Sequence, residues 1–250
     1  SLQPDKTAAS FLPCSENELP TTPHSLLRFE RMTMKRNDIL SDLYRRFPSL
    51  KSGKIEAAYQ LMHHTCSNGG KLLLCGNGGS ASDAEHIVGE LMKGFLLDRR
   101  LSKEESKKFS EIPGGAEIAS RLQGAIPAIS LNSQTSLMTA ISNDCSYDMV
   151  FAQQIYGYGN EGDCLIALST SGNSANIVNA VKTAKALGIH SIGITGSRNC
   201  ELAALCTICI QVPSRETRDV QEFTLPIYHT LCAMLEADFF SSADKQEAIL

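Results

Sequence analysis

A histidine and a carboxylate stand four residues apart about a third of the way along the chain. They are His86 and Glu90, and a helix through residues 80–90 would place both side chains on one face. Such a pair can share proton-transfer work or supply two ligands to a metal ion. The pair alone is a weak signal, because the same spacing arises by chance on many exposed helices.

A glycine-rich turn precedes this helix. Residues 72–75 (LLLC) form an apolar run typical of a buried strand in a parallel sheet. Residues 76–79 (GNGG) follow, and their glycines allow a tight turn. Ser80 then begins the helix, where its side-chain oxygen can cap free N–H groups. A strand, a glycine turn and a helix start form an anion site in α/β proteins, so we expect a phosphate-type ligand here.

A second polar loop repeats this arrangement. Residues 163–168 form another apolar run, residues 169–174 (STSGNS) follow it, and residues 175–187 have the pattern of an amphipathic helix. Four hydroxyls in six residues are a dense set of neutral donors, which suits a phosphate dianion that must bind and leave. The alternative is a plain Ser/Thr capping turn. The number of hydroxyls directly after a buried strand favours phosphate.

Two common nucleotide motifs are absent from these loops. The glycine turn lacks the spacing of the dinucleotide fingerprint GxGxxG, and neither loop contains the Gly-Lys-Ser/Thr of a P-loop. NAD and ATP are therefore disfavoured as ligands. The other residues able to carry chemistry are Asn143, Asp144, Gln221, Glu222 and His229.

The remaining elements must position these groups. Strands are predicted at residues 72–75, 125–130, 163–168, 190–195 and 206–212. Helices are predicted at residues 36–46, 53–66, 80–90, 132–141, 147–156, 175–187, 199–205 and 221–240. This alternation predicts an α/β fold: a five-stranded parallel doubly wound sheet flanked by helices, with N-terminal helices and a long C-terminal helix. Ligands of such sheets bind at the carboxyl ends of the strands, where both polar loops fall.

The chain is predicted to contain one domain and a tail. Residues 1–33 are expected to be a flexible tail, because their first 23 residues carry four prolines and no periodic apolar face. Residues 34–250 are expected to form a single domain. Within it, residues 98–123 are rich in charge and contain Pro-Gly-Gly, so we expect an insertion with a short helix near residues 103–109.

Composition narrows the possible partners. A net charge of −4 over 250 residues gives no reason to expect nucleic-acid binding. No apolar run approaches the ~20 residues that cross a bilayer, and no secretory signal is visible, so no membrane association is expected. The nine cysteines are odd in number, scattered, and often within apolar runs. Such cysteines indicate a cytoplasmic protein rather than a disulfide framework.

Taken together, four segments resemble one known family. They read GNGGSASDAEHIVGEL, NDCSYD, LSTSGNSANIV and QEFTLPIYH, and they are similar to the sugar isomerase (SIS) domain proteins of the phosphoheptose isomerase family. The resemblance spans about residues 36–240. It implies a SIS domain fold and a homotetramer with active sites at the subunit interfaces.

The resemblance also implies roles for individual residues. One zinc per subunit would be held by His86, Glu90, Gln221 and His229. The catalytic base and acid would be Glu90 and His229. The substrate would be bound by Asn77, Gly78, Gly79, Ser80, Glu90, Asn143, Asp144, Ser169, Thr170, Ser171, Ser174 and Gln221.

The implied reaction suits these residue types. The expected function is an aldose–ketose isomerase that converts sedoheptulose 7-phosphate to D-glycero-D-manno-heptose 7-phosphate through an enediol. A carboxylate would move the carbon-bound proton and a second group would serve the oxygens, while zinc would polarise the carbonyl. The alternatives are a non-catalytic SIS regulator that binds a sugar phosphate or a protein, and an isomerase of another sugar phosphate. The presence of both Glu90 and His229 favours an enzyme.

Two features near the C-terminus bear on how far the resemblance extends. Asp219 stands two residues before Gln221, where many relatives carry arginine. In addition, Gln221 and His229 on one straight helix would lie ~12 Å apart along its axis. Both can reach one metal ion only if Gln221 precedes the helix or Pro226 distorts it.

Overall fold

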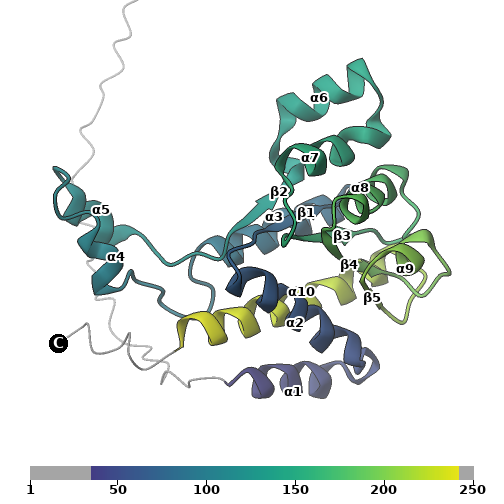
Figure 1. Ribbon diagram of the computed structural model, residues 1–250. Coiled ribbons are helices and arrows are strands. Elements are labelled where there is room, and N and C mark those ends of the chain that lie inside the picture. Colours follow the sequence, from purple (N-terminus) through teal and green to yellow (C-terminus); the bar gives the residue numbers. More distant parts are fainter. Residues whose placement is uncertain (1–34, 242–250) are drawn as a thin grey trace, which may run out of the picture. The chain divides into compact units, whose positions relative to one another are not determined.

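The computed structural model describes residues 35–241, and the tail expected at residues 1–33 lies outside this range. A five-stranded parallel sheet with the order β2-β1-β3-β4-β5 forms its centre (Figure 1). The strands are β1 (Leu72–Cys75), β2 (Ala128–Ser130), β3 (Cys164–Leu168), β4 (His190–Thr195) and β5 (Ile208–Gln211). The predicted fold class is therefore confirmed.

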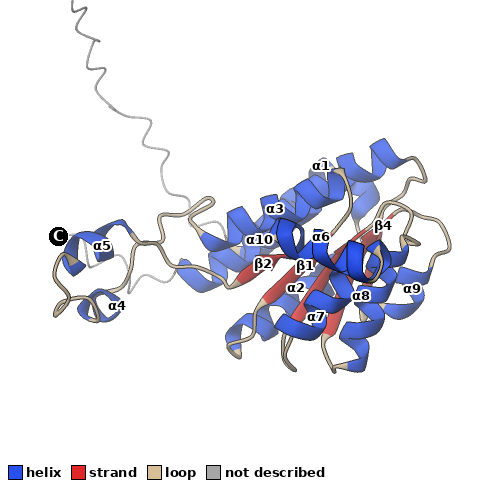
Figure 2. Cartoon of the chain, turned by 90° about the horizontal axis from the view of Figure 1, so that it is seen from above, coloured by secondary structure: helices blue, strands red, loops and turns tan. Residues whose placement is uncertain are grey.

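Helices cover both faces of the sheet (Figure 2). One face carries α1 (Arg36–Arg46), α2 (Gly53–Ser67), α3 (Gly79–Met92) and the long α10 (Thr217–Phe240). The other face carries α7 (Val150–Tyr158), α8 (Ala175–Ala186) and α9 (Glu201–Leu205), with α6 (Thr135–Asp144) packed on α7. The remaining helices are α4 (Lys103–Lys107), α5 (Gly115–Arg121) and the short 3-10 helices η1 (Pro48–Leu50), η2 (Leu131–Ser133) and η3 (Tyr147–Met149).

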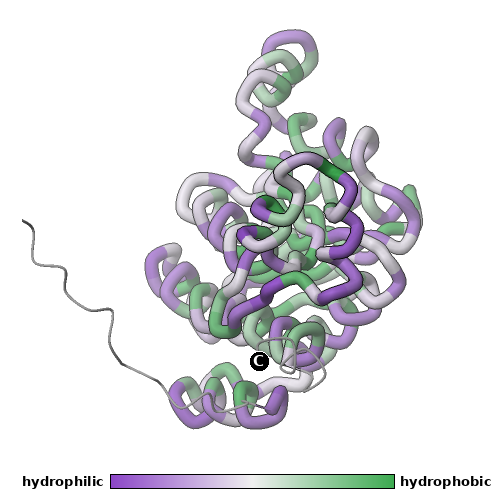
Figure 3. The backbone as a smooth tube through the Cα atoms, turned by 90° about the vertical axis from the view of Figure 1, so that its left-hand side faces the viewer, coloured by the Kyte–Doolittle hydropathy of each residue, from purple (hydrophilic) through white to green (hydrophobic). Residues whose placement is uncertain are grey.

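The core explains why the strands read as unbroken apolar runs. Leu72 and Leu74 of β1 point into the core under α2, α3 and α10, whereas Leu73 and Cys75 point into the core under α7 and α8. Because both faces are covered, neither set of alternating side chains is exposed to water. Hydrophobic segments accordingly gather around the sheet in Figure 3. In the described part of the chain, no helix has the length and apolarity that crossing a membrane requires.

The strand order reverses next to β1. Strand β1 pairs with β2 on one side and β3 on the other, so the connections after β1 and β3 leave the sheet toward opposite faces. This is the topological switch point, where doubly wound sheets open a crevice for ligands. The two polar loops predicted from the sequence, residues 76–79 and 169–174, follow β1 and β3 directly.

Several element boundaries differ from the sequence predictions. Helix α3 begins with Gly78 in the cap position and receives no side-chain cap, so the capping role expected for Ser80 is wrong; that side chain is buried. Helix α10 begins at Thr217, four residues before the predicted start. Helix α6 begins and ends three residues later than the predicted helix at residues 132–141, and the insertion contains a second helix, α5, that was not predicted.

A buried carboxylate joins the starts of β1 and β3. Asp163 accepts hydrogen bonds from the backbone N–H of Lys71 at 2.9 Å and from Nζ of Lys71 at 2.6 Å. The backbone N–H of Asn160 also donates to it, at 2.8 Å. This contact lies at the amino ends of the strands, on the opposite edge of the sheet from the two polar loops.

We expect Asp163→Ala to destabilise the fold. It leaves the N–H groups of Lys71 and Asn160 without their acceptor, which should lower the free energy of unfolding by about 2 kcal/mol. Urea denaturation monitored by circular dichroism measures this change. Glu161→Ala is the matched control, because Glu161 is exposed and should change stability by less than about 0.5 kcal/mol. Equal stabilities of the two variants would contradict the role given to Asp163.

Candidate active site

Two glycines of the turn after β1 have different roles: one adopts an unusual backbone conformation and the other packs closely against α10. Gly78 has φ +56° and ψ −121°, a conformation that side chains strongly disfavour. At Gly79 a Cβ atom would overlap the side-chain amide of Gln221 on α10, so this amide would have to move aside. The start of α3 and the amide of Gln221 are therefore in direct contact.

A reciprocal pair of amides joins the two polar loops. The Nδ2 group of Asn77 donates to Oδ1 of Asn176 at 2.9 Å, and Nδ2 of Asn176 donates to Oδ1 of Asn77 at 2.9 Å. Asn176 is only 3% exposed. The hydroxyl of Tyr147 also donates to Oδ1 of Asn77, at 3.1 Å. Sequence reasoning assigned no role to Asn176 or Tyr147, although both fall inside the motifs that carried the resemblance.

The serine loop after β3 folds around its own hydroxyls. Oγ of Ser169 lies 3.3 Å from Oγ of Ser174 and accepts the N–H of Gly172 at 3.1 Å. Oγ of Ser171 accepts the N–H of Asn173 at 3.2 Å. Ser174 occupies the cap position of the twelve-residue helix α8, but its side chain makes no capping bond. The N-terminus of α8 therefore keeps free N–H groups beside several hydroxyls, which is favourable for a phosphate.

A hydrogen-bonded chain of side chains runs between α3 and α10. Nε2 of His86 lies 3.1 Å from Oε1 of Glu90, as the spacing predicted. Nδ1 of His86 lies 2.9 Å from the hydroxyl of Tyr228, which donates to Oδ1 of Asp83 at 3.3 Å. Lys93 donates to the other oxygen of Glu90 at 3.3 Å. Tyr228 and Asp83 were not predicted to belong to the site. Both fall inside the segments that carried the resemblance, but only the packing of the two helices brings them together.

The hydrogen bonds among Asp83, Tyr228 and His86 determine which of their atoms carry the protons. When Tyr228 donates to Asp83, its oxygen accepts from Nδ1 of His86. A neutral His86 then turns the lone pair of Nε2 toward the carboxylate of Glu90, 3.1 Å away. Two acceptors at that distance repel each other unless a proton or a cation lies between them. Burial also raises the pKa of the Asp83 carboxyl and the pKa of the Tyr228 hydroxyl.

His229 completes a cluster with His86 and Glu90. Its ring centroid lies 5.0 Å from that of His86, with the rings nearly perpendicular, and 5.5 Å from that of Phe95. Its Nε2 atom is buried and has no hydrogen-bond partner within the described residues. Burial, and to a smaller degree His86, lowers the pKa of His229 below its ordinary value. At neutral pH the ring is therefore uncharged, with an unpaired nitrogen.

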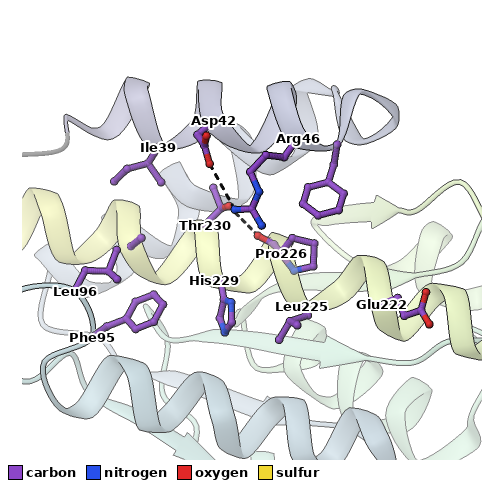
Figure 4. A pocket seen from close by; sticks show the side chains of 12 residues that line it. Ile39, Asp42, Arg46, Phe95, Leu96, Glu222, Leu225, Pro226, His229 and Thr230 are labelled. Carbon is purple, nitrogen blue, oxygen red and sulfur yellow. Dashed lines mark hydrogen bonds and ion pairs between the residues drawn. The ribbon is translucent and has the colours of Figure 1, made fainter.

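A cavity of about 340 Å³ opens beside this ring. Figure 4 shows His229 pointing from α10 to the side on which Phe95 lies, with α1 on the other side of α10. Arg46 and Asp42 of α1 line the cavity and form an ion pair with each other, at 3.5 Å. Its other lining residues are Ile39, Phe47, Phe95, Leu96, Glu222, Leu225, Pro226, His229, Thr230 and Ala233.

Other predicted site residues lie apart from this cluster. Gln221 lies inside α10 and against Gly79, two turns of α3 before His86, so it does not join His86 and His229 here. Asn143 and Asp144 are exposed at the end of α6 and hydrogen-bond to each other at 2.9 Å. Across residues 35–241, no three His, Cys, Asp or Glu side chains already lie close enough together to hold a metal ion.

Asp219 has local partners. It accepts hydrogen bonds from Oγ of Ser214 at 3.2 Å and from the guanidinium of Arg218 at 3.2 Å. The acidic side chain in this family position is thus paired with the arginine that directly precedes it.

Comparison with known proteins decides between the families that share such loops. The SIS domain family matches residues 37–108 and 109–196, more than half of the chain. The phosphoheptose isomerase of Aneurinibacillus thermoaerophilus is 42% identical over 173 residues, covering 69% of this chain and 75% of the relative. That of Burkholderia pseudomallei (strain K96243) is 41% identical over 174 residues, covering 70% and 76%. The chain belongs to the SIS-domain phosphoheptose isomerase family.

Solved structures agree with this assignment. A phosphoheptose isomerase from Neisseria gonorrhoeae superposes with a TM-score of 0.61 at 29% identity, covering 81% of this chain and 93% of that one. A phosphoheptose isomerase from Francisella tularensis gives a TM-score of 0.60 at 28% identity, covering 80% and 92%. The family resemblance predicted from the sequence is confirmed, and the alternative of a non-catalytic regulator is not favoured.

We expect protonation of His229 to destabilise the metal-free protein. Because its folded pKa is depressed, the folded state binds this proton less readily than the unfolded chain, whose histidine pKa is about 6.5. Its contribution to stability is full above about pH 6.5 and is lost as the pH falls through the lower folded value. Urea denaturation between about pH 7.5 and pH 5 should show a smaller loss in His229→Gln than in the wild type.

The exposed residue His190 provides the control for this measurement. His190→Gln should keep the pH dependence of the wild type. An identical pH dependence in all three proteins would show that His229 titrates as it does in the unfolded chain.

Proposed function

We propose that this protein is an aldose–ketose isomerase that converts sedoheptulose 7-phosphate to D-glycero-D-manno-heptose 7-phosphate. The observation that carries the proposal is the meeting of Glu90, His86 and His229 between α3 and α10, on the helix that begins at the glycine turn of the switch point. A protein that only bound a sugar phosphate would need the loops but not the cluster. Membership of the phosphoheptose isomerase family supports the same substrate.

The serine loop is suited to hold the phosphate end of the substrate. Ser169, Thr170, Ser171 and Ser174 surround the N-terminus of α8, whose free N–H groups favour a dianion. The amide pair of Asn77 and Asn176 fixes this loop relative to the glycine turn. A sugar anchored by its phosphate would then extend past Asn77, Gly78 and Gly79. Gln221, packed on Gly79, is placed to contact its hydroxyls.

The proton transfers are assigned to two residues. Glu90 would take the proton from the carbon next to the carbonyl and return it to the neighbouring carbon. Its side chain is 14% exposed, and Lys93 donates to one of its oxygens while the other lies 3.1 Å from Nε2 of His86. His229 would transfer protons to and from the substrate oxygens. Because its lowered pKa keeps the ring neutral, Nε2 could accept the proton of the substrate hydroxyl and return it to the former carbonyl oxygen as long as no metal ion occupies this nitrogen.

We also propose that zinc binds at this cluster. Two observations support it: the unpaired buried Nε2 of His229, and the two acceptors of His86 and Glu90 that face each other at 3.1 Å. Two imidazoles and a carboxylate are a common ligand set of catalytic zinc. His86, Glu90 and His229 would hold the ion after their side chains move closer together, and Gln221 would join only after its side chain leaves Gly79. When bound, zinc would polarise the substrate carbonyl.

The tetramer and the cellular location stay predictions from the sequence. The family resemblance implies a homotetramer with active sites at subunit interfaces, and light scattering of the purified protein measures the subunit number. Met92, Leu96 and Leu225 are between 41% and 57% exposed, and Leu96 and Leu225 line the cavity beside His229. These apolar side chains are available for a neighbouring subunit. Fractionation of cells that produce the protein tests the expected cytoplasmic location.

The activity is tested with purified protein and sedoheptulose 7-phosphate. We expect an aldose product in the wild type and a fall in kcat of about 10²- to 10⁴-fold in Glu90→Gln, because the amide cannot accept a carbon-bound proton. Glu85→Gln is the matched control: it makes the same change one helix position away from His86, on an exposed side chain. Saturable binding of the substrate without turnover in the wild type would overturn the enzyme and favour a sugar-phosphate-binding module.

Zinc binding is tested separately from catalysis. Isothermal titration of the metal-free protein with zinc should give one ion per subunit, and His86→Asn or His229→Asn should weaken binding by about 10-fold or more. The variant His190→Asn, at the exposed start of β4, should leave it unchanged. Zinc affinity that does not respond to either cluster histidine would place the ion elsewhere or exclude it.

A further inference from the structure

A buried ion pair joins α10 to the segment that follows α3. Nε of Arg99 donates to Oε1 of Glu236 at 2.7 Å, and the two side chains are 0% and 1% exposed. Arg99 is the largest fully buried side chain in the described part of the protein. Its guanidinium also lies 4.7 Å from the ring centroid of Phe240. Neither residue belongs to the site described above.

Arg99 uses its remaining donors on the end of α3. Nη2 donates to the backbone carbonyl of Glu90 at 2.9 Å, and Nη1 donates to that of Leu91 at 2.7 Å. Helix α3 ends at Met92, so these carbonyls belong to its last turn and lack partners within the helix. The charged fork therefore replaces the missing helical hydrogen bonds at the residue proposed as the catalytic base.

Glu236 fixes the chain that leaves α3. Its carboxylate accepts the backbone N–H groups of Phe95 at 2.8 Å, Leu96 at 2.7 Å and Leu97 at 3.2 Å. The first of these bonds determines where Phe95 lies against the ring of His229. Glu236 is also seven residues after His229, which is two helical turns along the same side of α10. One carboxylate thus holds both a neighbour of His229 and the arginine that holds Glu90.

Stability alone gives little reason for this arrangement. Burying two charges is costly, and apolar residues of similar size often stabilise a core equally well. The ion pair instead fixes the relative orientation of three segments. The guanidinium and the carboxylate together take part in six hydrogen bonds, which connect α3, residues 95–97 and α10. An apolar pair could slide, and Glu90 and His229 would move with it.

We propose that Arg99 and Glu236 are positioning residues that set the placement of Glu90 relative to His229. This inference rests on the proposed function for the roles of those two residues. Arg99 acts through the backbone of Glu90 itself, so a small shift of the guanidinium displaces the catalytic carboxylate. Glu236 acts through α10 and through Phe95. Neither touches the substrate.

The test replaces both charges together. The double variant Arg99→Met/Glu236→Leu leaves no unpaired buried charge, so it should remain folded. We expect its kcat to fall roughly 10- to 100-fold, because small displacements of reacting groups have effects of that size. KM should change by less than about threefold, since the phosphate loop lies elsewhere. A kcat within about twofold of the wild type in the folded variant would overturn the proposal.

Single conservative changes provide the second measurement. Arg99→Lys keeps the charge but lacks the planar fork that lets separate nitrogens reach Glu236 and the two carbonyls of α3, so its kcat should fall between those of the wild type and the double variant. Glu236→Gln keeps the shape and should behave similarly. If the double variant does not fold, these two decide: wild-type kcat in both would overturn the proposal.

A matched ion pair supplies the control. Lys71 and Asp163 are joined at 2.6 Å, and the hydrogen bonds of this pair go to Asn160 and Cys164, not to Glu90, His86 or His229. The variant Lys71→Met/Asp163→Leu should keep the wild-type kcat. An equal fall of kcat in this control would show that loss of any ion pair disturbs the enzyme, and would overturn the specific role of Arg99 and Glu236.

A spectroscopic readout separates this inference from the proposed function. The side-chain ¹⁵N signals of His86 and His229 report the contact between their rings whether or not the protein isomerises a sugar. We expect both signals to shift in Arg99→Met/Glu236→Leu, and the signal of His190 to stay in place. A wild type without isomerase activity would overturn the proposed function alone. Unshifted His86 and His229 signals in the folded variant would overturn the positioning role.

Discussion

The parallel packing of α3 on α10 is the constraint from which the site follows. Three contacts occur in the same order along both helices: Gly79 against Gln221, His86 against Tyr228, and the last turn of α3 against Glu236 through Arg99. The middle contact places His86 and Glu90 beside His229. Residues more than a hundred positions apart in sequence therefore meet because two helices keep one register, which close packing fixes at one end and the hydrogen bonds of Arg99 fix at the other.

Local patterns were sufficient to predict much of the fold. The bounds of β1, β4 and α1 agree with the predicted ranges. β1 is an unbroken apolar run, α1 is an amphipathic stretch followed by a proline, and β4 follows the glycine that ends the preceding helix. The loops of the switch point were also located, since hydroxyls and glycines directly after buried strands are typical of turns that bind anions. The His86–Glu90 contact followed from helical spacing alone.

What the sequence could not predict depends on contacts between distant segments. Arg99 read as one more charge in a charged insertion, yet it is buried, because only the fold brings Glu236 and the carbonyls of α3 to it. Gln221 fell outside the His cluster because α10 begins four residues early, which leaves it two turns away from His229. Tyr228 and Asn176 were missed for the same reason: their partners come from other elements.

The reciprocal amide pair of Asn77 and Asn176 has a consequence for the conditions under which the site keeps its shape. Each amide gives one donor and one acceptor to the other, and neither carries a net charge. Salt screens interactions between charges, so it has little effect on hydrogen bonds between these two neutral amides. Neither amide gains or loses a proton between about pH 4 and pH 10. The span between the glycine turn and the serine loop is therefore insensitive to ionic strength, while the phosphate it would receive is not. A change of salt concentration would therefore alter the binding of the phosphate but not the distance between the two loops.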